Sequence, residues 1–182
     1  KIEYFPIDIS EILTESSALL QRDYKDLHIT GIIDTYEGGL EFLKNYDDKK
    51  NLIIFLGSSF GNFTSDEGKE FLEKINSTMK DDDLFLIGLD LVKNKIILEN
   101  AYNDSQGVTA QFNLNVLSRI NDELGANFNL NNFTHHAIYN EHDQRIEMYL
   151  KSLVNQSVII SKANISLTLK KNELIHTEHS HK

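Results

Sequence analysis

Three aspartates follow apolar runs in the first half of the chain: Asp8, Asp34 and Asp90. Together with Gly57, which follows the remaining run, they are spaced by about one strand–helix unit each. If each run is a strand of a parallel sheet, the carboxylates gather at the edge where such sheets bind ligands. One carboxylate there can accept hydrogen bonds from the two hydroxyls of a ribose, and a second can accept from the adenine amino group. The pattern suits adenosine, although acidic residues also begin ordinary turns.

A glycine-containing loop, residues 57–62, reads Gly-Ser-Ser-Phe-Gly-Asn between a predicted strand and a predicted helix. Glycines in this setting allow a ligand to approach the backbone. The loop is not a Walker loop, because no lysine follows its second glycine, and it is not Gly-x-Gly-x-x-Gly. An ordinary turn explains it equally well, but the Asn62 amide could hold the carboxylate of an amino acid.

Histidines and polar residues crowd the end of the chain, where residues 176–181 read His-Thr-Glu-His-Ser-His. On a regular strand, His176, Glu178 and Ser180 would share one face and His179 and His181 the other. Neither face offers three good metal ligands, so we predict no metal site. The alternative is that Glu178 and Ser180 bind an imidazole or an amine by charge and hydrogen bonding.

The elements that must position these residues alternate between strand and helix in the first half. The third apolar run has no polar break, which predicts a strand buried on both faces. The alternation predicts an α/β fold with a parallel, doubly wound sheet. The predicted strands are residues 2–9, 27–33, 52–56 and 84–91, and the predicted helices are residues 11–21, 38–46 and 66–79.

The second half begins with a long amphipathic helix over residues 108–124, which Gly125 should end. Alternating segments then follow, with a hairpin turn at residues 141–144. This pattern predicts a smaller α+β lobe built on antiparallel strands, with a boundary near Lys93. The predicted strands of this lobe are residues 134–139, 145–150, 158–161, 165–169 and 174–178.

Composition narrows the function classes. The 182 residues hold 18 Lys and Arg against 28 Asp and Glu, a formal charge of −10, which argues against nucleic-acid binding. With no cysteine there is no disulfide framework and no thiol nucleophile. No apolar run approaches the roughly 20 residues that cross a bilayer, and no signal peptide precedes the first strand. We therefore expect a cytoplasmic enzyme or binding module.

Several motifs follow one another along the chain in a fixed order. They are residues 4–10, 55–62, 88–93, 101–104, 107–110, 112–115, 145–148 and 177–180. From Tyr4 to Lys182 this series resembles the histidine-specific, S-adenosylmethionine-dependent N-methyltransferases of ergothioneine biosynthesis. The broader family includes fungal enzymes that methylate a prenylated tryptophan amine.

The resemblance implies an enzyme that transfers methyl groups from S-adenosylmethionine to the α-amino nitrogen of L-histidine, giving the trimethylated product hercynine. It implies a Rossmann-type class I methyltransferase sheet in a cofactor domain, residues 1–92, and an α+β substrate lobe, residues 93–182. It further implies that Asp8 binds the ribose and that Asp34 accepts from adenine. Thr35 and Gly57 complete the implied cofactor residues, with Thr35 at a position that is usually aromatic in the family.

The implied substrate residues are six. Asn62 and Tyr102 resemble the pair that holds the substrate carboxylate, and Ser59 stands in the same loop as Asn62. Glu178 and Ser180 resemble the pair that binds the imidazole ring, and Met148 resembles a wall of the pocket. No acid, base or nucleophile is assigned, because methyl transfer from a sulfonium depends mainly on positioning and desolvation.

Two departures from the family pattern lead us to expect an internal fragment with little catalysis of its own. The glycine-rich cofactor loop after the first strand is absent, and so is the helical part that precedes it. Two alternatives stay open: a methyltransferase for another aromatic amine or amino acid, and a non-catalytic binding module with the same fold. Neither the number of methyl transfers nor the oligomeric state follows from the sequence.

Overall fold

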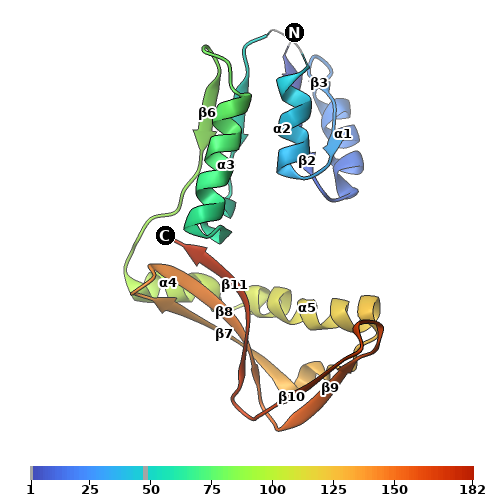
Figure 1. Ribbon diagram of the computed structural model, residues 1–182, viewed down its shortest axis with the longest axis vertical. Coiled ribbons are helices and arrows are strands. Elements are labelled where there is room, and N and C mark those ends of the chain that lie inside the picture. Colours follow the sequence, from blue (N-terminus) through green and yellow to red (C-terminus); the bar gives the residue numbers. More distant parts are fainter. Residues whose placement is uncertain (1, 47–48) are drawn as a thin grey trace. The chain divides into compact units, whose positions relative to one another are not determined.

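Residues 2–46 and 49–182 are described in the computed structural model, where packing divides the chain into two units (Figure 1). The first unit comprises the residues up to Ile54 together with Ser65–Leu86, and the second comprises Phe55–Thr64 and Ile87–Lys182. The loop that contains Asn62 therefore packs with the second unit. Assignment of residues 1–92 to the cofactor and 93–182 to the substrate stays a prediction.

A parallel ladder begins the first unit. Strand β1 (Glu3–Tyr4) pairs with β3 (His28–Ile29), and β2 (Ile7–Asp8) pairs with β4 (Ile32–Ile33). Each predicted strand is thus split into two short ones. The ladder continues across the split, because the Ile32 N–H donates to the Pro6 carbonyl at 2.9 Å, while Pro6 itself has no N–H to donate. Helix α1 (Ile12–Asp23) makes the crossover between the paired segments.

Two further helices and two strands complete the alternation. Helix α2 (Tyr36–Lys44) packs against α3 (Ser65–Thr78), as the 6.0 Å ring contact of Tyr36 with Phe71 shows. Strands β5 (Leu52–Phe55) and β6 (Leu84–Ile87) form a pair. The prediction that residues 52–56 are buried on both faces is wrong: Leu52 is 55% exposed and Ile54 51% exposed. Only the alternate side chains of β5 are partly covered.

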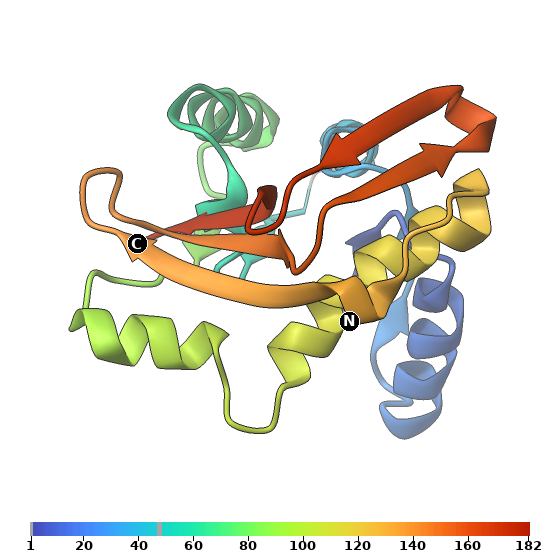
Figure 2. The same ribbon diagram turned by 90° about the horizontal axis from the view of Figure 1, so that it is seen from below.

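The second unit is built on a three-stranded antiparallel sheet in the order β11-β8-β7. Its strands are β7 (Phe133–Asn140), β8 (Arg145–Ser152) and β11 (Leu174–His181). Helices α4 (Lys95–Tyr102) and α5 (Val108–Leu124) lie along one side of it (Figure 2). Residues 141–144 form the predicted turn between β7 and β8, with Gln144 at φ 49°.

A β-bulge in β11 decides which side chains share a face. His176 pairs with Tyr149, whereas Glu178 pairs with the next residue of β8, Met148. The extra residue reverses the alternation at that point. The prediction that His176 shares a face with Glu178 is therefore wrong, and the His176 ring instead stacks with His179 at 5.7 Å. Glu178 and Ser180 do share a face, as predicted, and it is the face that α4 covers.

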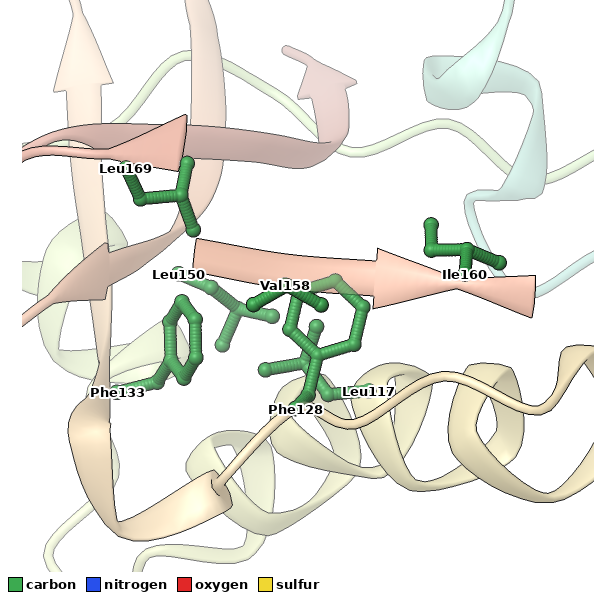
Figure 3. Packing of buried hydrophobic residues seen from close by; sticks show 7 residues of the cluster. All are labelled: Leu117, Phe128, Phe133, Leu150, Val158, Ile160 and Leu169. Atoms are coloured by element: carbon green, nitrogen blue, oxygen red, sulfur yellow. The ribbon is translucent and has the colours of Figure 1, made fainter. Parts of the chain in front are cut away.

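The main core of the second unit joins α5 to the sheet and to a separate hairpin. This hairpin consists of β9 (Gln156–Ile160) and β10 (Ile165–Leu169), joined through the short 3₁₀ turn η3 (Ser161–Ala163). Another 3₁₀ turn, η2 (Leu130–Asn132), leads into β7. Figure 3 shows seven apolar side chains of this core: Leu117, Phe128, Phe133, Leu150, Val158, Ile160 and Leu169.

Most elements of the second unit lie where the sequence predicts them. Helix α5 spans residues 108–124 as expected, and Gly125 ends it in the left-handed region at φ 63°. Helix α4 was not predicted.

The fold class is α/β, but the described residues form sheets of only two or three strands and no continuous doubly wound sheet. No described helix is long and apolar enough to cross a membrane.

A buried carboxylate sits on the other face of the sheet. Glu147 is 5% exposed and accepts hydrogen bonds from Arg145, Tyr149 and Asn140. Burial alone would raise the pKa of Glu147, but these hydrogen bonds outweigh it and hold that pKa at about 2. In return, the bond to Glu147 raises the pKa of Tyr149 to about 12.

The core of Figure 3 predicts a large difference between two leucines. Leu150 is completely buried in β8, whereas Leu174 on β11 is 43% exposed. We expect Leu150→Ala to lower the free energy of unfolding by about 3 kcal/mol, because it removes core contacts and leaves a cavity. Leu174→Ala, the same change at a surface position, should cost less than about 1 kcal/mol. Urea unfolding followed by circular dichroism measures both, and equal losses would contradict the assigned burial.

The Glu147 cluster predicts acid sensitivity. Because the pKa of Glu147 in the folded protein, about 2, lies below the ordinary glutamate value of 4.5, the stabilisation is complete above about pH 4.5 and is lost as the pH falls toward 2. We expect a contribution of about 2–3 kcal/mol to the free energy of unfolding at neutral pH. Glu147→Gln should lower stability at pH 7 and flatten its fall in acid. Glu123→Gln, at an exposed ion pair with Arg119, is the control and should leave the acid profile unchanged.

Candidate substrate site

The glycine loop forms a sharp turn that brings Asn62 to the sheet of the second unit. Gly57 and Ser58 both have positive φ angles, 87° and 60°, and the short 3₁₀ helix η1 (Ser59–Asn62) follows. Gly61 packs directly on β11: a Cβ atom at this position would lie 2.7 Å from the His181 carbonyl oxygen and 3.0 Å from Ser180 Oγ. Only glycine allows this close approach, so the packing of the loop on β11 explains why its second glycine, Gly61, is a glycine.

Asn62 and Glu178 are joined across this contact. The Asn62 side-chain amide donates to Glu178 Oε1 at 2.9 Å. Glu178 is opposite Met148 in the sheet, and Ser180 is opposite Ile146, so these four side chains share one face. Met148 is only 3% exposed and Ser180 is buried as well. The two residues predicted to bind the ring, Glu178 and Ser180, thus place a carboxylate and a hydroxyl beside the buried side chains of Met148 and Ile146.

Tyr102 reaches the same face from the end of α4, where it packs on the cluster of Leu98, Ala137, Tyr139, Ile146 and Met148. A buried network holds its backbone. The Asn113 side-chain nitrogen donates to the Tyr149 carbonyl at 3.0 Å, because a carbonyl only accepts, and it lies 2.9 Å from His135 Nδ1. Since an amide nitrogen only donates, Nδ1 is the acceptor of this second bond. His135 therefore carries its proton on Nε2 and donates it to the Tyr102 carbonyl at 2.8 Å.

Lys182 links the two predicted halves of the site. Its ammonium donates to Ser180 Oγ at 2.9 Å and to the Tyr102 hydroxyl at 3.0 Å. It also lies 3.4 Å from Asp90 Oδ2 and 4.9 Å from the centre of the Tyr102 ring. A hydrogen bond from Lys93 to the same carboxylate is the main reason that the pKa of Asp90 is lowered to about 2. We call Asn62, Tyr102, Glu178, Ser180 and Lys182 the polar cluster.

The predicted cofactor carboxylates lie in the first unit, at the ends of paired parallel strands. The Asp34 N–H donates to the Asp8 carbonyl at 3.1 Å, so the two residues are neighbours. Each side chain is exposed and accepts one backbone bond, Asp8 from Ser10 at 2.8 Å and Asp34 from Thr35 at 2.7 Å. Thr35 caps α2 by accepting from Gly38.

These two carboxylates keep acceptor positions free for a ligand. A carboxylate has two oxygens with about four acceptor positions, so one turn hydrogen bond leaves capacity for ribose hydroxyls or an adenine amino group. Gly57 and Ser59 belong to the turn and to η1, beside Asn62 in the second unit. Within the described residues, no group of three His, Cys, Asp or Glu side chains is arranged to hold a metal ion.

The residues that sequence reasoning missed are those that support the predicted ones. Lys182 follows Glu178 and Ser180 at the same two-residue spacing, and this period was the available signal. Asp90 was noted as a strand end but received no role in the site. His135 and Asn113 act on Tyr102 through the backbone, and nothing in their local sequence indicates it.

Comparison with known proteins places the chain among methyltransferases. A family model described as histidine-specific, S-adenosylmethionine-dependent methyltransferase matches residues 1–182. The histidine N-alpha-methyltransferase of Mycobacterium tuberculosis is 35% identical over 176 residues, which are 96% of this chain and 54% of that protein. Ergothioneine biosynthesis protein 1 of Neurospora crassa is 32% identical over 126 residues, 68% of this chain and 14% of that protein.

A third relative carries a different substrate in its name. The L-tryptophan methyltransferase trpM of Psilocybe serbica is 28% identical over an alignment that covers all of this chain and 54% of that protein. The chain thus spans about half the length of the mycobacterial and Psilocybe relatives. Given the match of the family model over its whole length, the chain belongs to the histidine-specific, S-adenosylmethionine-dependent methyltransferase family.

Proposed function

We propose that the protein containing this chain transfers methyl groups from S-adenosylmethionine to the α-amino nitrogen of L-histidine, up to the trimethylated product. The observation that carries the proposal is the polar cluster. It places a carboxylate, an amide and two hydroxyls from three separate elements on one sheet face, above the buried Met148. Histidine offers matching groups: a ring with two nitrogens at one end and a carboxylate at the other.

The donors and acceptors divide between the two ends of the substrate. Glu178 can accept from a ring N–H, and Ser180 can donate to the other ring nitrogen. The Asn62 amide has two N–H groups, of which one already holds Glu178, so the second can donate to the substrate carboxylate. Tyr102 supplies a further donor to that carboxylate. Fixing both ends orients the α-amino nitrogen between them.

In the first unit, we assign ribose binding to Asp8 and adenine binding to Asp34, with Thr35 beside them. The parallel pairs β1–β3 and β2–β4 support a Rossmann-type methyltransferase sheet. When bound, S-adenosylmethionine supplies a sulfonium methyl group: the lone pair of the neutral amine forms the new carbon–nitrogen bond, and the electrons of the broken carbon–sulfur bond stay on the sulfur, which becomes a thioether. The methylated ammonium loses a proton after the first and after the second transfer, whereas the third transfer gives a quaternary ammonium with no N–H.

A second candidate is N-methylation of another aromatic amino acid, which the Psilocybe relative favours by its name. Glu178 argues for histidine between the two. An indole has only one ring nitrogen, so an indole substrate would leave either Glu178 or Ser180 without a ring partner. Leaving a polar group of a binding site unpaired costs affinity.

The first prediction concerns the product. The complete reading frame that contains this chain, incubated with S-adenosylmethionine and L-histidine, should yield histidine carrying one, two or three added methyl groups, as measured by mass spectrometry. Methylation of another amine in a parallel panel, with histidine unchanged, would support the second candidate. No transfer to any amine would contradict both and favour a binding module that retains the fold.

The second prediction concerns substrate choice. Glu178→Met should lower kcat/KM for histidine by about 100-fold or more, because the ring N–H loses its charged acceptor, while affecting L-tryptophan much less. Glu141→Met, the same replacement in the exposed turn between β7 and β8, is the control and should change neither value. An equal loss of kcat/KM for both substrates would show that Glu178 does not distinguish the imidazole ring from the indole ring.

A further inference from the structure

We propose that Lys182 is a positioning residue that makes the site selective for a ring nitrogen without a hydrogen. Its ammonium donates to the hydroxyls of Ser180 and Tyr102, so the hydrogens of both hydroxyls point away from it and can donate to a substrate. The inference rests on the proposed function, since it explains how the same cluster distinguishes histidine from similar rings.

The first step is the environment of the ammonium. The Lys182 side chain is 1% exposed, although lysine is rarely buried unless it is paired. Its three N–H groups face three oxygens: Ser180 Oγ, the Tyr102 hydroxyl and Asp90 Oδ2. Asp90 balances the charge, and Lys93 lies beside the same carboxylate. The donor capacity of Lys182 is therefore fully used within the site.

The second step is what an ammonium does to a hydroxyl. A serine or tyrosine hydroxyl can donate or accept, and its rotation normally adapts to either kind of ligand. An ammonium only donates, so a hydroxyl next to it must accept, and its hydrogen must point away. Lys182 thus fixes the direction of hydrogen bonding for two hydroxyls of the site, those of Ser180 and Tyr102.

The third step concerns the ligand. With the direction of both hydroxyls fixed, the face of the sheet presents one charged acceptor, Glu178, and two donors, Ser180 and Tyr102. A neutral imidazole has one N–H and one bare nitrogen, which match Glu178 and Ser180. The remaining donor, Tyr102, suits a carboxylate. A ring without the bare nitrogen leaves the Ser180 donor unpaired in a buried position, which is costly.

The test compares L-histidine with pyrrolylalanine, whose ring keeps one N–H and lacks the bare nitrogen. Binding by calorimetry and KM and kcat for methyl transfer are measured in the complete reading frame. The unsubstituted protein should prefer histidine by about 100-fold or more. Lys182→Met frees the Ser180 hydroxyl to rotate, so the preference should fall below about tenfold, mainly through Kd and KM. Lys182→Arg, which keeps a donor, should retain much of the preference.

Lys93→Met is the matched control, because Lys93 pairs with the same Asp90 carboxylate but is not part of the polar cluster. It should leave the preference unchanged. A Lys182→Met protein that folds and keeps the full preference would overturn the inference while leaving the proposed function intact. An unsubstituted protein that neither binds nor methylates histidine would overturn both.

A second variant covers the case in which Lys182→Met does not fold. Ser180→Ala removes the donor that Lys182 is proposed to direct, so it should weaken histidine binding and, by removing the unpaired donor, strengthen pyrrolylalanine binding. Equal weakening of both ligands would show that Ser180 does not address the bare nitrogen, and the inference would then fail.

Discussion

The register of β11 against β8 is the constraint on which the candidate site depends. One extra residue between His176 and Glu178 reverses the alternation of the strand, so that the residues after it present Glu178 and Ser180 to the face that α4 covers. Without the bulge, the strand could keep either His176 or Glu178 in its present orientation, but not both. The polar cluster and the histidine row on the opposite face are two results of the same irregularity.

Close packing supports this arrangement from the loop side. Gly61 lets η1 approach β11 until backbone nearly touches backbone, and Asn62 then reaches Glu178. The side chain proposed to bind the substrate carboxylate is thereby hydrogen-bonded to the side chain proposed to bind the ring. Tyr102 is held by a different route, through His135 and the buried Asn113. The substrate face is thus positioned mostly by contacts away from any ligand.

The sequence was most informative where one local rule dominates. Periodicity and the terminal glycine predicted α5, and alternation predicted the strands of the second unit and the shared face of Glu178 and Ser180. The bulge was not predicted, because no residue type in 176–178 requires one. The burial of residues 52–56 was overestimated because an apolar run shows that a strand can be covered, not that it is. The two-residue spacing after Ser180 could have placed Lys182 on the same face, but its pairing with Asp90 joins distant segments and is not encoded by local spacing.

The aromatic row on the opposite face has a practical consequence. Rings of His136, Tyr149, His176, His179 and His181 follow one another at 5.1–6.5 Å across β7, β8 and β11, and β11 carries Glu178 and Ser180 of the polar cluster on its other side. The chain has seven histidines and no tryptophan, so the imidazole proton resonances of this row form a sparse, natural set of probes. Ring-current shifts report small changes in ring stacking, and occupancy of the site can be followed by NMR through the thickness of the sheet without any label.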